Sequence, residues 1–132
     1  MGDRVWMSLT CLKKDRKLFE NMGFTQVEGS GDTWIELVDE SANYAHYDEL
    51  RKVKAPFVAH HYEGCEYGGV TYACDGKSIK EWAMDHEGFE IVYMSSVDLK
   101  TGILRKDVIR EYRKFLNTRK RARKLLGLQE DK

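Results

Sequence analysis

The sequence predicts an α+β fold, with a ferredoxin-like βαββαβ start, a sheet extended by additional antiparallel strands, and a long C-terminal helix. Three observations support this prediction. Short segments alternate apolar and polar residues with the period of two that strands require. Two segments between them repeat apolar residues with helical spacing, in the element order of a split βαβ unit. The segment from Leu104 to Leu126 has the same helical spacing and contains neither glycine nor proline.

The composition indicates a folded protein of ordinary size. The chain has 132 residues, of which 42% are hydrophobic, and this suits one domain with one core. The three cysteines show no C-x-x-C pair, which favours a reduced protein. We find no signal peptide and no apolar run near the roughly 20 residues of a membrane span. We therefore expect a cytoplasmic protein that does not bind membranes.

The first half is expected to contain four strands and two helices. The predicted elements are strand 4–11, helix 13–22, strands 24–28 and 33–38, helix 44–53 and strand 57–62. Val5, Met7 and Leu9 fall on one face of the first strand, and Gly23 is placed to cap the first helix. Pro56 ends the second helix and opens the next strand, a position that strands tolerate.

The second half is expected to add strands to the sheet. The predicted elements are strands 70–74, 78–84 and 89–94 and helix 104–126, with a tight turn at Asp75-Gly76. We expect strand 57–62 to lie beside strand 4–11 and to be internal, because neither of its faces is plainly polar. An alternative pairing, as in vicinal-oxygen-chelate folds, needs two βαβββ modules, and helix 44–53 comes one strand too early for it.

Zero net charge hides an asymmetry between the body of the chain and its end. Residues 1–104 carry 11 basic and 18 acidic side chains, a net charge of −7, and residues 105–132 carry 11 basic and 4 acidic ones, a net charge of +7. We divide the chain accordingly into an α+β sheet domain, 1–104, and a basic C-terminal helix and tail, 105–132, that belongs to the same domain and partly projects. A separation of charge of this kind bears on which partners the protein binds, and it does not identify the fold.

The C-terminal helix is the main candidate for a binding surface. Its first half has an apolar stripe from Val108 to Leu116, which we expect to pack against the sheet or a second subunit. Its second half is expected to project, and its cations would neutralise phosphates. The candidate residues for binding nucleic acid or a protein partner are Arg113, Arg119, Lys120, Arg121, Arg123 and Lys124. The sequence thus favours a small non-enzymatic binding or accessory protein.

Other interpretations of this helix stay open. Cations at the end of a helix also complement its dipole and keep it soluble. Leu125, Leu126 and Leu128 would suit docking to a partner protein or to a twin subunit, as in a homo-oligomeric scaffold. Neither the ligand nor the subunit number follows from the sequence.

The segment from Pro56 to Gly76 contains two adjacent histidines and two of the three cysteines, residue types that can bind a metal or take part in catalysis. His60 and His61 are neighbours in a predicted strand, so they point to opposite faces. A hairpin turning symmetrically about residues 65–67 would place His60 with Tyr72 and Cys74, and His61 with Thr71 and Asp75. The second arrangement would allow a His61–Asp75 pair to orient a general base.

A metal or catalytic site in this hairpin is the alternative to a binding protein. The weak metal candidates are His60, Cys65, Cys74 and His86, but their spacing matches no zinc module. Glu63 and Glu66 would raise the pKa of the Cys65 thiol, which disfavours a nucleophile. We therefore expect no catalytic residue, no metal and no cofactor.

Overall fold

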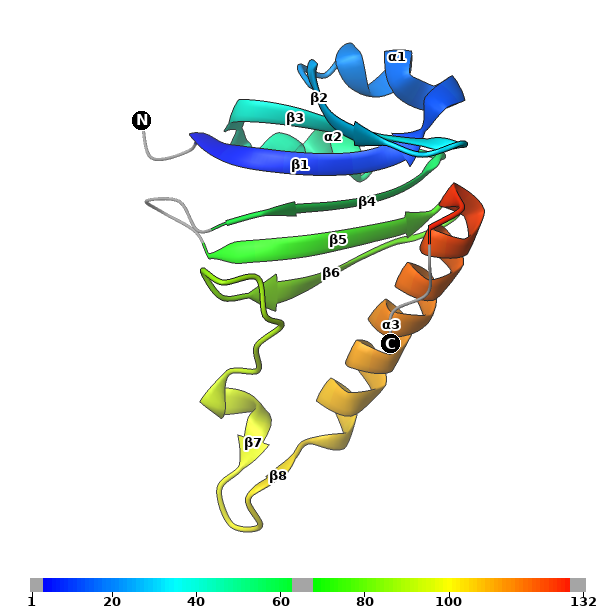
Figure 1. Cartoon of the computed structure of the whole chain (residues 1–132). Helices are drawn as coiled ribbons and strands as arrows, with labels where there is room; N and C mark the ends of the chain where they lie inside the picture. Colours follow the sequence, from blue (N-terminus) through cyan, green and yellow to red (C-terminus); the bar gives the residue numbers. More distant parts are fainter. Residues whose placement is uncertain (1–3, 63–67, 129–132) are drawn as a thin grey trace.

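Six strands form one antiparallel sheet in the order β2-β3-β1-β4-β5-β6 (Figure 1). The computed structural model describes residues 4–62 and 68–128. The strands are β1 (Arg4–Leu12), β2 (Gln26–Ser30), β3 (Trp34–Asn43), β4 (Pro56–His61), β5 (Gly69–Asp75) and β6 (Ile79–Met84). The sequence correctly placed β4 beside β1 as an internal strand, and β5 and β6 extend the sheet beyond it.

Two short helices lie on one face of this sheet. A 3-10 turn at Lys13–Asp15 leads into α1 (Arg16–Glu20), and a second turn at Tyr44–His46 leads into α2 (Tyr47–Leu50). Both are shorter than the predicted helices 13–22 and 44–53. They cover the apolar face of the sheet, where the largest fully buried side chains are those of Phe19, Phe24, Phe57, Met7, Leu9, Leu37 and Leu50.

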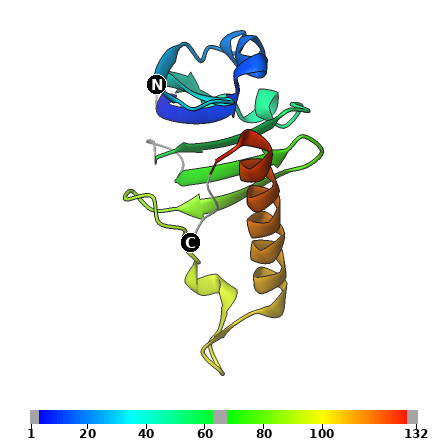
Figure 2. The same ribbon diagram turned by 45° about the vertical axis from the view of Figure 1, so that its right-hand side comes forward.

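The long helix α3 (Lys106–Leu126) lies on the opposite face of the sheet (Figures 1 and 2). Trp82 of β6 points to this face, because its neighbour Glu81 pairs with core-facing Tyr72, and its ring lies 6.3 Å from that of Phe115. The buried residues of α3 are Phe115, Thr118, Ala122 and Leu126. The end of the helix therefore packs on β4, β5 and β6, and its beginning extends past the sheet beside β7 (Val97–Asp98) and β8 (Ile103–Leu104).

Two predictions need correction. The apolar stripe from Val108 to Leu116 was expected to be the packed part of the helix, but most of the packed residues come after it. The strand predicted over 89–94 does not form, because the chain that returns from the turn at Asp85 pairs with β6 only briefly. After one bridge between Met84 and Glu90, the segment leaves the edge of β6.

The ferredoxin-like architecture is not confirmed beyond a mixed α+β fold. The sheet order differs by the two strands outside β4, and α1 and α2 have only five and four residues. The one long helix covers the other face. In the described part of the chain, none of the helices combines the length and apolar character that crossing a membrane requires.

Candidate functional site

The hairpin of β4 and β5 pairs with a register that differs by one residue from the predicted one. His61 lies opposite Val70, and His60 lies opposite Thr71. His61 therefore shares a face with Tyr72 and Cys74, the face that was predicted for His60. A slip of one residue moves every side chain of a strand to the other face, so the predicted His61–Asp75 pair is wrong.

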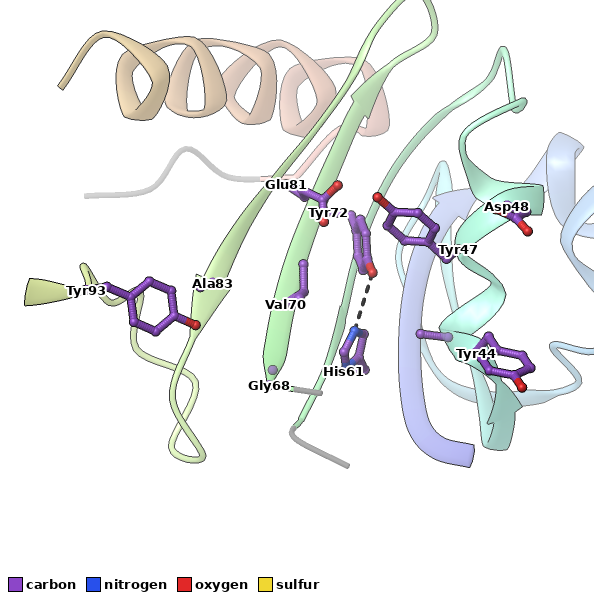
Figure 3. Close-up of a pocket in the computed structure, with 12 residues that line it drawn as sticks. Tyr44, Tyr47, Asp48, His61, Gly68, Val70, Tyr72, Glu81, Ala83 and Tyr93 are labelled. Carbon is purple, nitrogen blue, oxygen red and sulfur yellow. Dashed lines mark hydrogen bonds between the residues drawn. The ribbon is translucent and has the colours of Figure 1, made fainter. Parts of the chain in front are cut away.

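His61 is buried with both ring nitrogens close to partners. Its Nδ1 lies 2.9 Å from the Tyr62 carbonyl oxygen, so it is the donor, and Nε2 accepts from the Tyr72 hydroxyl at 3.4 Å (Figure 3). Burial lowers the pKa of His61 below its usual value, and the Tyr62 carbonyl only partly opposes this effect. The imidazole is therefore neutral, and it accepts a hydrogen bond from the buried Tyr72 hydroxyl.

His60 faces the other side of the sheet among aromatic rings. Its ring lies 5.8 Å from that of Trp6 and 5.6 Å from that of Tyr62. Burial and the neighbouring His61 lower the pKa of His60 as well. The two histidines thus have separate surroundings, as strand alternation predicted.

The candidate metal ligands do not come together. His60 and Cys74 lie on opposite faces of the hairpin, and His86 is exposed beside Glu87. Burial is the main effect that raises the pKa of the Cys74 thiol. Cys65 lies outside the described residues, and among those described no group of three or more His, Cys, Asp or Glu side chains is arranged to hold a metal ion.

A cavity of about 390 Å³ opens beside His61 and Tyr72 (Figure 3). Tyr44, Tyr47 and Tyr93 stand around it, from the α2 region on one side and from the segment after β6 on the other. The Glu81 carboxylate at its edge accepts a hydrogen bond from Arg51 at 2.8 Å. The cavity is a hollow of aromatic character, and the sequence contained no motif that marked it.

One wall of this cavity is built on an uncommon backbone. Tyr44, Ala45 and His46 all have positive φ angles near 50°, which non-glycine residues adopt at a cost. The His46 imidazole holds the turn in place, because its Nε2 lies 2.7 Å from the Asp39 carboxylate and its ring lies 4.9 Å from that of Phe24. This turn carries the Tyr44 and Tyr47 side chains to the cavity.

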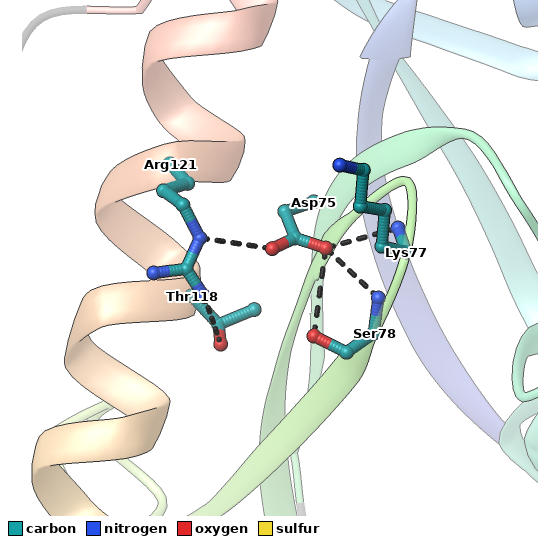
Figure 4. Close-up of polar contacts among 5 residues, drawn as sticks. All are labelled: Asp75, Lys77, Ser78, Thr118 and Arg121. Carbon is teal, nitrogen blue, oxygen red and sulfur yellow. Dashed lines mark hydrogen bonds and ion pairs between the residues drawn. The ribbon is translucent and has the colours of Figure 1, made fainter.

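Two arginines of the predicted basic cluster form ion pairs with the sheet domain. Arg121 donates from Nε to the Asp75 carboxylate at 2.9 Å and from Nη2 to the Thr118 hydroxyl at 3.2 Å (Figure 4). Arg119 donates to Glu90 Oε1 at 2.7 Å, and the Tyr112 hydroxyl donates to the same oxygen at 3.2 Å. These arginines therefore attach α3 to the end of β5 and to the segment that follows β6.

The Asp75 carboxylate is the centre of the first attachment. Its partial burial would raise its pKa, but donors from the Ser78 backbone, the Arg121 guanidinium and the Lys77 backbone outweigh that effect and lower the pKa to about 2. One carboxylate oxygen, Oδ1, accepts from both Lys77 N and Ser78 N, and the other, Oδ2, accepts from Arg121 (Figure 4). The carboxylate thus joins the β5–β6 turn to α3.

The outer face of α3 carries cations at alternating intervals of four and three residues. We call this set the basic row; it consists of Lys106, Arg110, Arg113, Lys120 and Lys124, with Asn117 at the one intervening position. All five cations are exposed. A helix turns about 100° per residue, so these intervals keep the side chains on the face opposite the packed residues.

The predicted binding residues thus fall into separate groups in the structure, and the exposed face of α3 contains two further cations. Arg113, Lys120 and Lys124 belong to the basic row, Arg119 and Arg121 pair with carboxylates, and Arg123 is half-buried. Sequence analysis missed Lys106 and Arg110, although the four-three spacing is visible in the sequence. The higher density of cations after residue 118 obscures this spacing.

Comparison of the chain with models of known protein families, with curated proteins and with solved structures finds no match. What the chain binds is therefore inferred from its own geometry.

Proposed function

We propose that the protein is a non-enzymatic accessory protein that binds nucleic acid through the basic row, without sequence preference. The observation that supports the proposal is the row itself: five exposed cations on one face of one straight element. Phosphate contacts of this kind supply affinity by releasing counterions and carry no sequence information.

The dimensions of the row suit a phosphate backbone. Lys106 and Lys124 are separated by 18 positions, which corresponds to about 27 Å along a helix. The two acidic residues of α3 lie off this face, where Asp107 pairs with Arg105 and Glu111 pairs with Lys114. No carboxylate of the helix therefore interrupts the row.

The proposal predicts a strong dependence on salt. If five phosphates are neutralised, the slope of log K against log salt is about −4.5 for duplex DNA. Replacing Arg113, Lys120 and Lys124 by glutamine should make the slope less steep by about 2.7, because three contacts are lost. The measurement is fluorescence anisotropy with a labelled 20-base-pair duplex over a salt series.

A matched control keeps the change in net charge the same. Lys13, Lys14 and Lys17 are exposed cations on the other side of the sheet, and the triple glutamine variant at these positions should bind almost as the natural chain does. Equal losses in the two variants, or no binding by the natural chain at low salt, would contradict the proposal.

Deletion of residues 117–132 does not isolate the binding surface. It also removes Thr118, Ala122 and Leu126, which are buried against the sheet. A loss of binding in that truncation would not separate a missing surface from a damaged fold, so the exposed substitutions are the better experiment.

A further inference from the structure

The segment between β6 and α3 exposes an unusual number of large apolar side chains. We call residues 89–104 the arm. Six of its side chains are 45–82% exposed: Phe89, Val92, Tyr93, Met94, Leu99 and Ile103. Comparable residues elsewhere in the described chain are scattered over several elements. A concentration of this kind in 15 positions marks an interaction surface.

The arm is an ordered structure, so the exposure does not come from a frayed segment. Gly102 N donates to Asp98 O at 2.7 Å and closes the β7–β8 hairpin, where Gly102 has a positive φ of 73°. Arg105 N donates to Ser96 O at 3.0 Å and closes the base of the arm. The Trp82 indole nitrogen donates to Ile91 O at 2.9 Å and ties the beginning of the arm to β6.

Hollows lined mostly by apolar side chains lie beside these protruding side chains. One, of about 350 Å³, is bounded by Trp82 and Ala83 of β6, by Val92 of the arm and by Val108 of α3, and Glu81, Asp107 and Glu111 also line it. A second, of about 400 Å³, has Trp82, Val92 and Val108 in its wall and continues along α3 to Leu116. In the first half of α3, Phe115 is buried, but Val108, Ile109 and Tyr112 are only half-buried, so the sheet does not fully cover the beginning of the apolar stripe.

The exposed area is large for a monomer. At roughly 150–250 Å² for a large side chain, the exposed fractions correspond to an area on the order of 700 Å². The largest apolar patch of a typical monomer measures about 300–600 Å², and a standard interface buries about 800 Å² on each partner. The six side chains of the arm, summed over all its sides, come close to the second value.

We propose that a second copy of this chain covers the arm and the adjoining half of α3, in a two-fold dimer. A two-fold interface uses the same surface on both subunits, so that surface must hold both protrusions and hollows. Here Val92 is itself exposed and lines both hollows, so the two features form one continuous surface.

The charges of the chain do not oppose a second copy as the partner. Two copies with zero net charge have no overall repulsion between them. Arg113 of the basic row borders the second hollow, but the other four cations of the row do not line either hollow, so the dimer would still present these four on each copy. The proposal does not depend on the binding of nucleic acid.

The test is the mass of the full-length chain in solution, measured by light scattering from about 1 to 100 µM, since association depends on concentration. We expect twice the 15.4 kDa of the chain. The variant M94E/L99E should dissociate at least about 100-fold more readily, because carboxylates would be buried without partners. Circular dichroism checks its fold, and Leu99→Glu alone replaces it if the double variant is unfolded.

The control variant is L18E/V27E, which adds the same charges at two side chains that are each 42% exposed, on α1 and β2, away from the arm. It should remain dimeric. A natural chain that is monomeric at the highest concentration would overturn the proposal, and so would a folded M94E/L99E variant that stays dimeric.

Discussion

The two halves of α3 differ in charge and in surroundings, since residues 106–116 carry four basic and two acidic side chains and residues 117–126 carry five basic and no acidic ones. The second half, which holds most of the basic cluster, lies against the sheet through Thr118, Ala122 and Leu126. The first half, which has the more obvious apolar stripe, extends past the sheet. The small side chains of Thr118 and Ala122 let the helix approach β5, where Ala73 is fully buried. Side-chain size at the contact, more than the density of charge, identifies the half that packs.

The comparison is tested most directly by truncating one side chain of α3 that packs on the sheet and one that lies near its beginning. Phe115→Ala should lower the free energy of unfolding by about 3–5 kcal/mol, because Phe115 is fully buried, whereas Val108→Ala should lower it by less than about 1 kcal/mol. Urea unfolding of both variants in the M94E/L99E background separates packing from self-association. Equal losses would show that the two halves do not differ in the way described.

A smaller effect is expected from the ion pair that attaches the second half. The pKa of Asp75 falls from 3.8 to about 2 on folding, so the carboxylate stabilises the fold above pH 4 by about 2 kcal/mol. That contribution is lost as the pH falls from about 4 to about 2. Asp75→Asn should therefore weaken the fold at pH 7 and flatten the dependence of stability on pH in this range.

The measurement for Asp75 is urea unfolding at a series of pH values. Asp48→Asn, a change at an exposed carboxylate on α2, is the control and should leave the stability at pH 7 within about 0.5 kcal/mol. An unchanged pH dependence in Asp75→Asn would show that the Arg121 pair does not attach the helix.

The smallest expected difference concerns the end of α3. Gly127 caps the helix with a φ of 83°, and a Cβ there would lie 2.5 Å from the Thr33 hydroxyl, which donates to Leu126 O at 2.7 Å. Gly88 has a similar φ of 90°, but a Cβ there meets open space. Gly127→Ala should therefore cost about 1 kcal/mol more than Gly88→Ala in thermal or urea unfolding.

Matched losses in the two glycine variants would mean that only the backbone conformation matters at Gly127. In that case the contact between the end of α3 and Thr33 would not contribute to docking. A larger loss at Gly127 would locate the attachment of the helix at its last turn, where Leu126 is fully buried.

Periodicity predicted most elements because it depends on local burial. The alternation in residues 4–11 and 57–62 and the helical repeat in 104–126 all correspond to elements of the structure. The strand expected over 89–94 does not form, because after the turn at Asp85 the returning chain makes only one bridge with β6, between Met84 and Glu90. The apolar composition of residues 89–94 did not show whether they form a paired strand or part of the exposed arm.

The candidate site was less predictable than the fold. Alternation correctly separated His60 from His61, but the faces were exchanged because pairing places His61 opposite Val70. The spacing of the cations in the sequence predicts the basic face of α3. No pattern in the sequence predicts that Thr118 and Ala122 are buried. The cavity beside His61 joins residues of distant segments, so no local pattern marks it.

The sequence by itself determined the mixed α+β class, most of the strand segments, the long C-terminal helix and the separation of charge, because each depends on neighbouring residues. Only the tertiary structure decided the hairpin register, the face on which α3 packs, the half of it that is buried and the carboxylates that hold Arg119 and Arg121. These depend on contacts between segments far apart in the chain, such as Arg121 and Asp75. Local propensity does not encode such contacts, because the fit of distant surfaces selects them.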